Sequence, residues 1–325
     1  MKQGRSKKKR FLWITDPWDT LDHPHDTTLR LAQEALAQGH ESWWTAANTL
    51  HLEEGNVRAH IQQLFEIPFA PQADDVRMGE TLVSHAVDEF DSVHYRVDPP
   101  VDLTYLHNLH ILSFARTEVI NPPFALFVTN EKLEALTLGK DGEFAPPTLV
   151  ASGLEDLQEF GDRHGKTILK PLNQAQSKGI SVLDWSNPGD SDSARSALAS
   201  LTDDFTQPVL LQKFLKGVQD KGELRLWFLD GKLLASARKV PKMGEAIINM
   251  DRGSTLVEGK PQGKELELVK VIGKRLKDLK VRLAAVDLID GLVTDFNITS
   301  PGLLIQMEKL AGENLAQKII RALAV

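Results

Sequence analysis

The sequence predicts an α/β protein that opens with a doubly wound α/β domain. The apolar run Phe11–Thr15 is typical of a short strand and stops at Asp16-Pro17. After a loop, Asp26 can cap a helix from Thr27 to Gln38, and Gly39 can end it. A strand, a loop at its carboxyl end and a helix form the first unit of a doubly wound sheet. Two hairpins further along the chain add antiparallel strands.

The clearer hairpin runs from Glu223 to Val240 around the turn Asp230-Gly231, a dipeptide typical of two-residue turns. Asn130 begins a further helix, and Ser193 can cap another from Ala194 to Leu201, after a polar loop. The remaining expected elements are strands at Val93–Arg96 and Thr167–Leu172, helices at Leu154–His164 and Leu266–Leu279, and a final helix at Leu303–Ala324 interrupted near Gly312.

Length and composition indicate a large protein with an ordinary core. The 325 residues can form two or three domains, and 42% hydrophobic with 26% charged residues is usual for a globular protein. No apolar run reaches the ~18 residues of a transmembrane helix, so no membrane partner is expected. The absence of cysteine excludes disulfides, thiolate metal sites and cysteine nucleophiles. These features predict a cytoplasmic protein.

The positive charge is concentrated in the first ten residues, MKQGRSKKKR, which carry six basic side chains. We expect residues 1–10 to form a disordered arm, with weak anion binding as the alternative. The net charge of −7 becomes −13 when these six residues are set aside. An acidic body argues against a nucleic-acid partner.

Three oxygen-bearing side chains mark the stretch from Val281 to Gly302. Asp287 lies in one apolar strand, while Asp295 and Asn297 share a face of the next. A carboxylate in an apolar strand costs several kcal/mol unless it is paired. A hard divalent cation such as Mg2+ would pair with all three. The alternative is an ordinary hairpin with exposed polar residues.

A shared cation requires a particular strand register. A two-residue turn at Asp290-Gly291 pairs Asp287 with Thr294 and sends Asp295 to the opposite face. Facing carboxylates therefore predict an odd-numbered connection, Asp290-Gly291-Leu292, with a bulge.

These motifs resemble a known family. Asp287, then Asp295-Phe-Asn297 and Ser300-Pro301, is similar to the metal-binding end of ATP-grasp ligases, and in particular of bacterial glutathione synthetases. The likeness runs over nearly the whole chain. It implies an amino-terminal substrate-binding α/β domain at 11–125, followed by an ATP-grasp fold of two α+β lobes, a lid lobe at 126–206 and a catalytic lobe with the metal site at 207–325.

The resemblance assigns roles to residues that would otherwise carry no signal. It implies nucleotide binding by the following side chains and backbone groups: Lys132, Lys170, Lys178, Gln212, Lys213, Phe214, Leu215 and Glu223. It implies catalytic roles for Arg225 and Asn249. It implies a substrate pocket formed by Asp16, Asp26, Thr27, Arg96, Ser300, Pro301 and Gly302.

The sequence departs from the family pattern at several of these positions. The glycine-rich phosphate loop is replaced by residues 173–179, in which one glycine remains and Lys178 could supply the missing contact. Asp295 stands where the family usually has glutamate. Val97 and Ile247-Ile248 stand where the family has Lys and Arg-Gly. The family has threonine after Pro301. Gly302 stands there in this sequence, and it resembles the Ser-Pro-Gly of other ATP-grasp amino-acid ligases.

The implied reaction is ATP-dependent carboxylate–amine ligation through an acyl phosphate, with Mg2+ or alternatively Mn2+ as the cation. The implied partners are small molecules: a γ-glutamyl peptide or amino acid, and an amine such as glycine. A homo-oligomer is expected. Three functions remain open: glutathione synthetase, a related ligase for another acid–amine pair, and a nucleotide-binding protein that has lost turnover.

Overall fold

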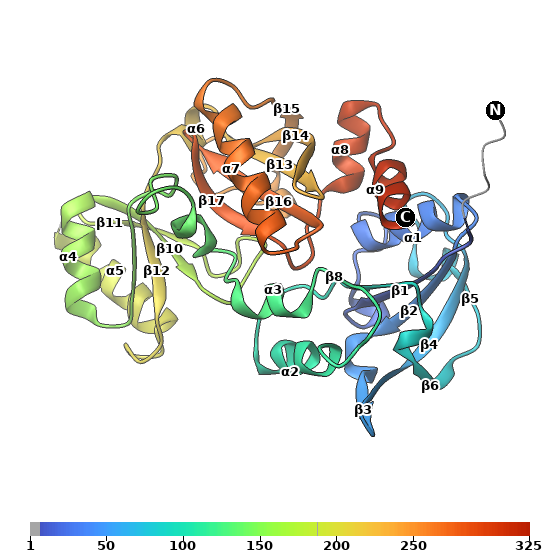
Figure 1. Cartoon of the computed structure of the whole chain (residues 1–325). Coiled ribbons are helices and arrows are strands. Elements are labelled where there is room, and N and C mark those ends of the chain that lie inside the picture. Colours follow the sequence, from blue (N-terminus) through green and yellow to red (C-terminus); the bar gives the residue numbers. More distant parts are fainter. Residues whose placement is uncertain (1–6, 187) are drawn as a thin grey trace.

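The computed structural model describes residues 7–186 and 188–325, with the side chains of residues 188–192 left aside. Its three sheets follow one another along the chain (Figure 1). Of the arm predicted at residues 1–10, residues 1–6 lie outside the described residues. Beyond that point Lys8 pairs with Glu41 at 2.8 Å and Arg10 begins the first strand.

The amino-terminal sheet is mixed, with eight strands in the described part of the chain. Its parallel centre is formed by β2 (Glu41–Ala46), β1 (Arg10–Thr15), β7 (Ser92–Tyr95) and β8 (Val119–Ile120). Antiparallel strands complete one side: β3 (His51–Glu53), β4 (Asn56–Glu66), β5 (Arg77–Met78) and β6 (Leu82–Ala86). The helices of this part are α1 (Thr27–Ala37), α2 (Leu103–Leu112) and α3 (Pro123–Val128).

The predicted strand–loop–helix opening is confirmed. Helix α1 begins after Asp26, whose Oδ1 accepts a hydrogen bond of 2.7 Å from the Leu29 amide. Gly39 follows α1 with a φ of 85°, a left-handed conformation that glycine adopts without strain.

The second sheet is antiparallel, in the order β11-β10-β12-β9. It contains β9 (Thr148–Ala151), β10 (Lys166–Pro171), β11 (Ser181–Asp184) and β12 (Val209–Lys213), with helices α4 (Leu154–His164) and α5 (Pro188–Leu201). The prediction that α5 starts at Ala194 was wrong. The helix starts six residues earlier at Pro188, where the missing amide of proline costs nothing in the first turn.

The expectation of a helix that begins at Asn130 was also wrong. Asn130 Oδ1 accepts a 3.0 Å hydrogen bond from the Lys132 amide, a local bond that starts a turn. Only the short 3-10 helix Glu134–Thr137 follows.

The third sheet is antiparallel, in the order β15-β14-β13-β16-β17. Its strands are β13 (Glu223–Leu229), β14 (Lys232–Val240), β15 (Thr255–Glu258), β16 (Leu283–Ile289) and β17 (Leu292–Asn297). The helices of this region are α6 (Gly217–Asp220), α7 (Lys264–Asp278), α8 (Leu304–Ala311) and α9 (Leu315–Leu323). Gly312 separates the last two helices, as predicted. None of the helices in the described residues is both long and apolar enough to cross a membrane.

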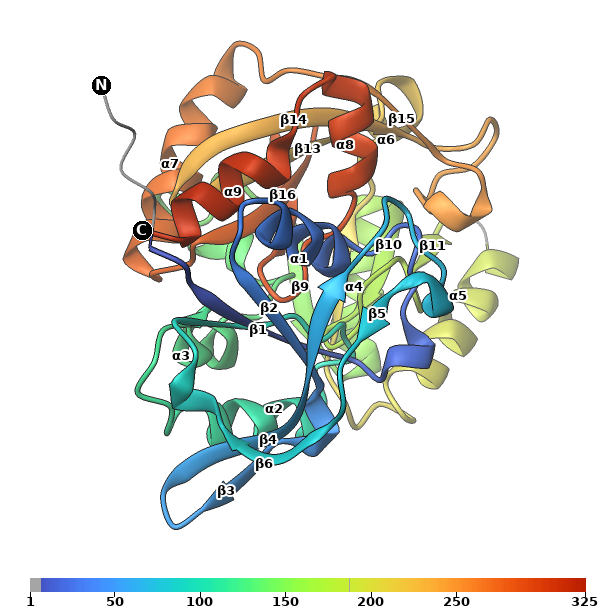
Figure 2. The same cartoon turned by 90° about the vertical axis from the view of Figure 1, so that its right-hand side faces the viewer.

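The last two helices return to the amino-terminal domain. Helices α8 and α9 lie beside α1 in both views (Figures 1 and 2). One hydrophobic core contains Trp13 and Leu31 from the start of the chain together with Leu315 and Ile319 from its end. Next to this core, the buried guanidinium of Arg30 donates to Glu308 Oε2 at 2.8 Å. The two ends of the chain therefore share one core.

Candidate functional site

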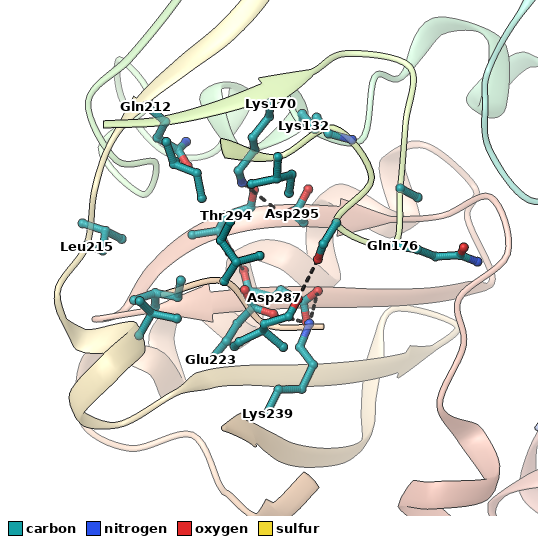
Figure 3. Close-up of a pocket in the computed structure, with 18 of the residues that line it drawn as sticks. Lys132, Lys170, Gln176, Gln212, Leu215, Glu223, Lys239, Asp287, Thr294 and Asp295 are labelled. Atoms are coloured by element: carbon teal, nitrogen blue, oxygen red, sulfur yellow. Dashed lines mark hydrogen bonds and ion pairs between the residues drawn. The ribbon is translucent and has the colours of Figure 1, made fainter. Parts of the chain in front are cut away.

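One pocket lies between the second and third sheets and gathers all of the predicted nucleotide and metal residues (Figure 3). Its free space, open mouth included, is about 950 Å3. The predicted residues in its lining are Lys132, Lys170, Lys178, Gln212, Lys213, Phe214, Leu215, Glu223, Arg225, Asp287, Asp295 and Asn297. The two sheets thus supply opposite walls of one site.

The hairpin that carries Asp287 and Asp295 reaches the expected register by a different route. Its turn is the tight Asp290-Gly291, with φ of 52° and 73°, and Ile289 pairs directly with Leu292. The prediction of a three-residue connection was therefore wrong. A bulge at Thr294, however, inserts one residue into β17, and Asp287 then faces Asp295 as required. The bulged carbonyl of Thr294 accepts a 3.0 Å hydrogen bond from Lys170 Nζ.

Asp287 is the most strongly paired carboxylate in the pocket. Arg225 donates to it through Nε at 2.9 Å and Nη2 at 2.7 Å, and Lys239 Nζ lies 3.0 Å from Oδ2. Burial alone would raise the pKa of Asp287, but the charges of Arg225 and Lys239 outweigh it and hold the pKa well below its usual range. The same pairing overcomes burial and raises the pKa of Arg225.

The other pocket charges form a second pair and a bridge. Lys170 Nζ lies 3.2 Å from Asp295 Oδ2. Lys239 also forms an ion pair with Glu223, whose pKa is raised by burial although the ammonium acts against that shift. Lys239 thus bridges two carboxylates in the floor of the pocket.

The oxygen donors in this set fit a hard divalent cation. Within the described residues, no three His, Cys, Asp or Glu side chains form a metal cluster. The set is instead two facing carboxylates, Asp287 and Asp295, with the amide of Asn297 on the same strand face. Asn297 donates through Nδ2 to Ala285 O at 3.0 Å and to Asp287 at 3.2 Å, so its Oδ1 is the atom suited to a cation.

The residues 212–215, predicted to bind the nucleotide, enter the pocket at the end of β12. Gln212 is buried and donates through Nε2 to Thr148 Oγ1 at 2.9 Å. The Phe214 ring carries the Lys166 ammonium 4.9 Å from its centre. These contacts fix the side chains around the apolar end of the pocket, which includes Leu215.

The loop at residues 173–179 forms part of the pocket wall without a glycine-rich backbone. Gln176 and Ser177 adopt φ of 56° and 60°, a conformation that costs a non-glycine residue about 1–2 kcal/mol. Lys132 Nζ donates to the carbonyl of Gln174. Lys178 lines the pocket from the same loop.

Asn249 does not join this lining. Its side chain accepts a 3.1 Å hydrogen bond from the Arg252 amide and caps the short turn Met250–Arg252. The preceding Ile247 and Ile248 do line the pocket. A catalytic role for Asn249 therefore stays a prediction.

The predicted substrate residues gather at a neighbouring junction, where the amino-terminal domain meets segment 300–302. Buried Arg96 donates to Thr28 Oγ1 and to the Pro301 carbonyl, both at 2.9 Å. The Thr27 hydroxyl accepts from the Leu304 amide at 3.4 Å, and the Gly302 carbonyl accepts from Trp227 Nε1 at 3.2 Å.

Three carboxylates converge at this junction. Asp16 Oδ2 accepts a 2.9 Å hydrogen bond from the Asp98 amide. Burial raises the pKa of Asp98, and the nearby Asp16 and Asp26 raise it further, against the effects of Arg96 and the Ser300 hydroxyl. Burial also raises the pKa of Asp26. The junction is suited to a ligand that carries both an ammonium and a carboxylate group.

Two residues that line the pocket, Lys239 and Glu131, were not singled out from the sequence. Lys239 faces Glu223 only because Leu234 forms a bulge in β14; an unbroken register from the Asp230-Gly231 turn would place Arg238 there. Glu131 is buried, and its Oε1 accepts from the amides of Ile298 at 2.6 Å and Thr299 at 2.8 Å, directly after the metal strand. Only the position of Glu131 beside Lys132 could have indicated its role.

Both parts of the chain match family models. The model of the prokaryotic glutathione synthetase N-terminal domain matches residues 10–126, and that of the prokaryotic glutathione synthetase ATP-grasp domain matches residues 131–312. The chain belongs to the prokaryotic glutathione synthetase family. It is therefore an ATP-dependent carboxylate–amine ligase.

Individual relatives agree with this family. The chain is 29% identical to the glutathione synthetase of Nostoc sp., over 96% of this chain and 97% of the relative. It is also 29% identical to that of Synechocystis sp., over 96% and 98%. Among solved structures, D-cycloserine synthetase DcsG has a TM-score of 0.69 at 17% identity, covering 97% of this chain and 98% of that chain. This last likeness concerns the fold, and it confirms the predicted ATP-grasp architecture.

Proposed function

We propose that this chain is a glutathione synthetase that joins the cysteinyl carboxylate of γ-glutamylcysteine to the amine of glycine. The observation that carries the proposal is the arrangement of Arg225 and Lys239 around Asp287, facing Lys170 and Asp295 across one pocket. Family membership adds the identity of the substrates. The division into an amino-terminal domain at 11–125 and lobes at 126–206 and 207–325 is part of this proposal.

The chemistry explains why the pocket is rich in cations. An amine cannot displace an oxygen from a carboxylate at neutral pH, because that oxygen is a poor leaving group. ATP therefore first phosphorylates the carboxylate, and phosphate becomes the leaving group. Charge spreads over the transferred phosphoryl group, and fixed cations stabilise it. Lys132 and Lys170 bind the nucleotide phosphates, while Arg225 and Lys239 stabilise the transferred group.

Mg2+ is the proposed cation, with Mn2+ as the alternative. Asp287, Asp295 and Asn297 would hold it, and when bound it would neutralise phosphate charge. Lys170 and Lys239 pair with the two carboxylates in the structure, so they would exchange these partners for phosphate oxygens.

The acid substrate occupies the junction of the amino-terminal domain with segment 300–302. Its ammonium group faces Asp16, Asp26 and Asp98, and its carboxylate lies towards Arg96. Thr27, Ser300 and Gly302 complete this end of the site. Adenine lies against Gln212, Lys213, Phe214 and Leu215 at the other end.

The test is ADP release by the purified chain, measured with γ-glutamylcysteine and glycine and with each substrate omitted. Release that requires both substrates and yields glutathione supports the proposal. Binding of ATP without ADP release for any acid–amine pair would favour the nucleotide-binding alternative. Light scattering on the same sample tests the predicted homo-oligomer.

One observation favours a second candidate, a ligase for another acid–amine pair. Ile247 and Ile248 line the pocket where the family has Arg-Gly, and Val97 is buried where it has lysine. An apolar wall can accept a bulkier substrate than glycine. A panel of γ-glutamyl acids and small amino acids in the same assay separates the two candidates.

A further inference from the structure

The loop at 173–179 is joined by side chains to both of its neighbouring domains. Gln176 Nε2 donates to Asp98 Oδ2 at 2.9 Å, and Ser177 Oγ donates to the Ile248 carbonyl at 2.6 Å. The start of the loop is also anchored, because the Val101 amide donates to the Asn173 carbonyl at 2.8 Å.

These contacts connect segments that are far apart in the sequence. The loop follows β10 of the second sheet, Asp98 follows β7 of the amino-terminal sheet, and Ile248 lies between β14 and β15 of the third. Gln176 stands at the edge of the pocket, on the side opposite Leu215 (Figure 3). The loop therefore covers the pocket where the three parts of the molecule meet.

The two residues whose side chains make the contacts are also the two non-glycine residues of the loop in a left-handed conformation. Gln176 and Ser177 have φ of 56° and 60°, where glycine would be unstrained but other residues are not. A glycine loop at this place would close through its backbone alone. Here the side chains of Gln176 and Ser177 extend from this strained backbone, and their hydrogen bonds to other parts of the molecule hold the loop in place.

We propose that Gln176 and Ser177 form a latch that holds the loop over the nucleotide, and that Asp98 couples this closure to binding of the acid substrate. The coupling rests on the proposed function, which places the substrate ammonium beside Asp98. An ammonium at this position attracts the Asp98 carboxylate and holds it in place as the acceptor for Gln176. Both residues are positioning residues, since neither touches a reacting atom.

The latch itself is tested without any substrate, by limited trypsin cleavage after Lys178. The cleavage rate at this bond, followed by mass spectrometry and normalised to the unfolded chain, reports loop opening. Gln176→Ala should raise the rate about five-fold, the factor for one net hydrogen bond. The matched control is Asn173→Ala in the same loop, because Asn173 contacts Val101 through its backbone. Equal rates for the two variants would overturn the latch.

The coupling is tested by the affinity for a non-hydrolysable ATP analogue, with and without γ-glutamylcysteine. The acid should tighten analogue binding by the wild type. In Gln176→Ala the factor of tightening should be about five-fold smaller, whereas in Asn173→Ala it should equal that of the wild type. A wild type that binds both ligands independently would overturn the coupling. A wild type that binds no γ-glutamylcysteine would instead contradict the proposed substrate, and the trypsin result would still decide the latch.

Discussion

Arg225 and Asp287 lie directly opposite each other on the central strands β13 and β16 and are joined by two parallel hydrogen bonds of 2.9 and 2.7 Å. Both side chains are largely buried, so neither charge is screened effectively by water. Asp295 faces Asp287 from the other side. This row of three residues across the sheet forms the charged floor of the site.

Asp287→Asn should reduce ligation and also weaken the fold. The change leaves Arg225 and Lys239 without their shared anion, and breaking a buried pair costs about 3 kcal/mol. Loss of a cation ligand should lower kcat/KM by about 100-fold or more. Urea unfolding and ADP release measure the two effects. Asp278→Asn, at an exposed carboxylate paired with Lys274, is the control and should change neither. Full activity of Asp287→Asn at saturating Mg2+ would contradict the site.

Lys239→Met should lower kcat strongly, whereas Lys239→Arg should keep much of the activity. The methionine fills a similar volume without the charge that bridges Glu223 and Asp287. Steady-state kinetics with varied ATP measure the effect. Arg238→Met is the matched control, since Arg238 directly precedes Lys239 and points to the opposite face of β14. Equal losses in both variants would show that Lys239 has no special role.

Deletion of Thr294 should reduce ligation while leaving Asp287 opposite Asp295. Without the extra residue, continuous pairing from the Asp290-Gly291 turn still brings Asp295 to Asp287, but the carbonyl that accepts a hydrogen bond from Lys170 Nζ is lost. Thr294→Ala keeps this carbonyl, so it should retain far more activity than the deletion. Circular dichroism and ADP release distinguish a lost contact from a lost fold. A deletion variant as active as Thr294→Ala would show that the bulge is not required.

Asp98→Asn should change how stability depends on pH. The pKa of Asp98 is raised by burial and then by Asp16 and Asp26, so the folded state binds its proton more tightly than the unfolded state. Its contribution to the free energy of unfolding is thus fully present below about pH 4 and is lost as the pH rises through the folded-state pKa. Asparagine carries no charge at any pH and should be stabilising relative to wild type at pH 8 but not at pH 4. A difference in urea midpoint that is the same at both pH values would refute this.

The sequence was sufficient where one residue type has one local role. Asp26 was expected to cap a helix, and Asp230-Gly231 to form a two-residue turn, because the side chain or the positive φ is itself the cause. The family motif likewise brought Asp287, Asp295 and Asn297 to one pocket. These predictions depend on neighbours within a few residues.

The bulges could not be predicted. Leu234 and Thr294 are ordinary strand residues, and either could pair regularly. The Thr294 bulge is joined to a distant part of the chain, because its carbonyl accepts a hydrogen bond from Lys170, 124 positions away in the sequence. The same is true of Gln176, whose partner Asp98 lies 78 positions away. Such pairings become visible only once the three sheets are assembled.

The pairing of Arg30 with Glu308 has a consequence for how the protein is made. The partners are 278 positions apart, and the helices that carry Glu308 and Ile319 cover apolar residues of the first domain. During translation, roughly 15–60 s pass between synthesis of the two partners. Throughout that interval the apolar face that includes Trp13 and Leu31 lacks the residues of α8 and α9 that complete its core. This face can be covered only once both helices have been synthesised.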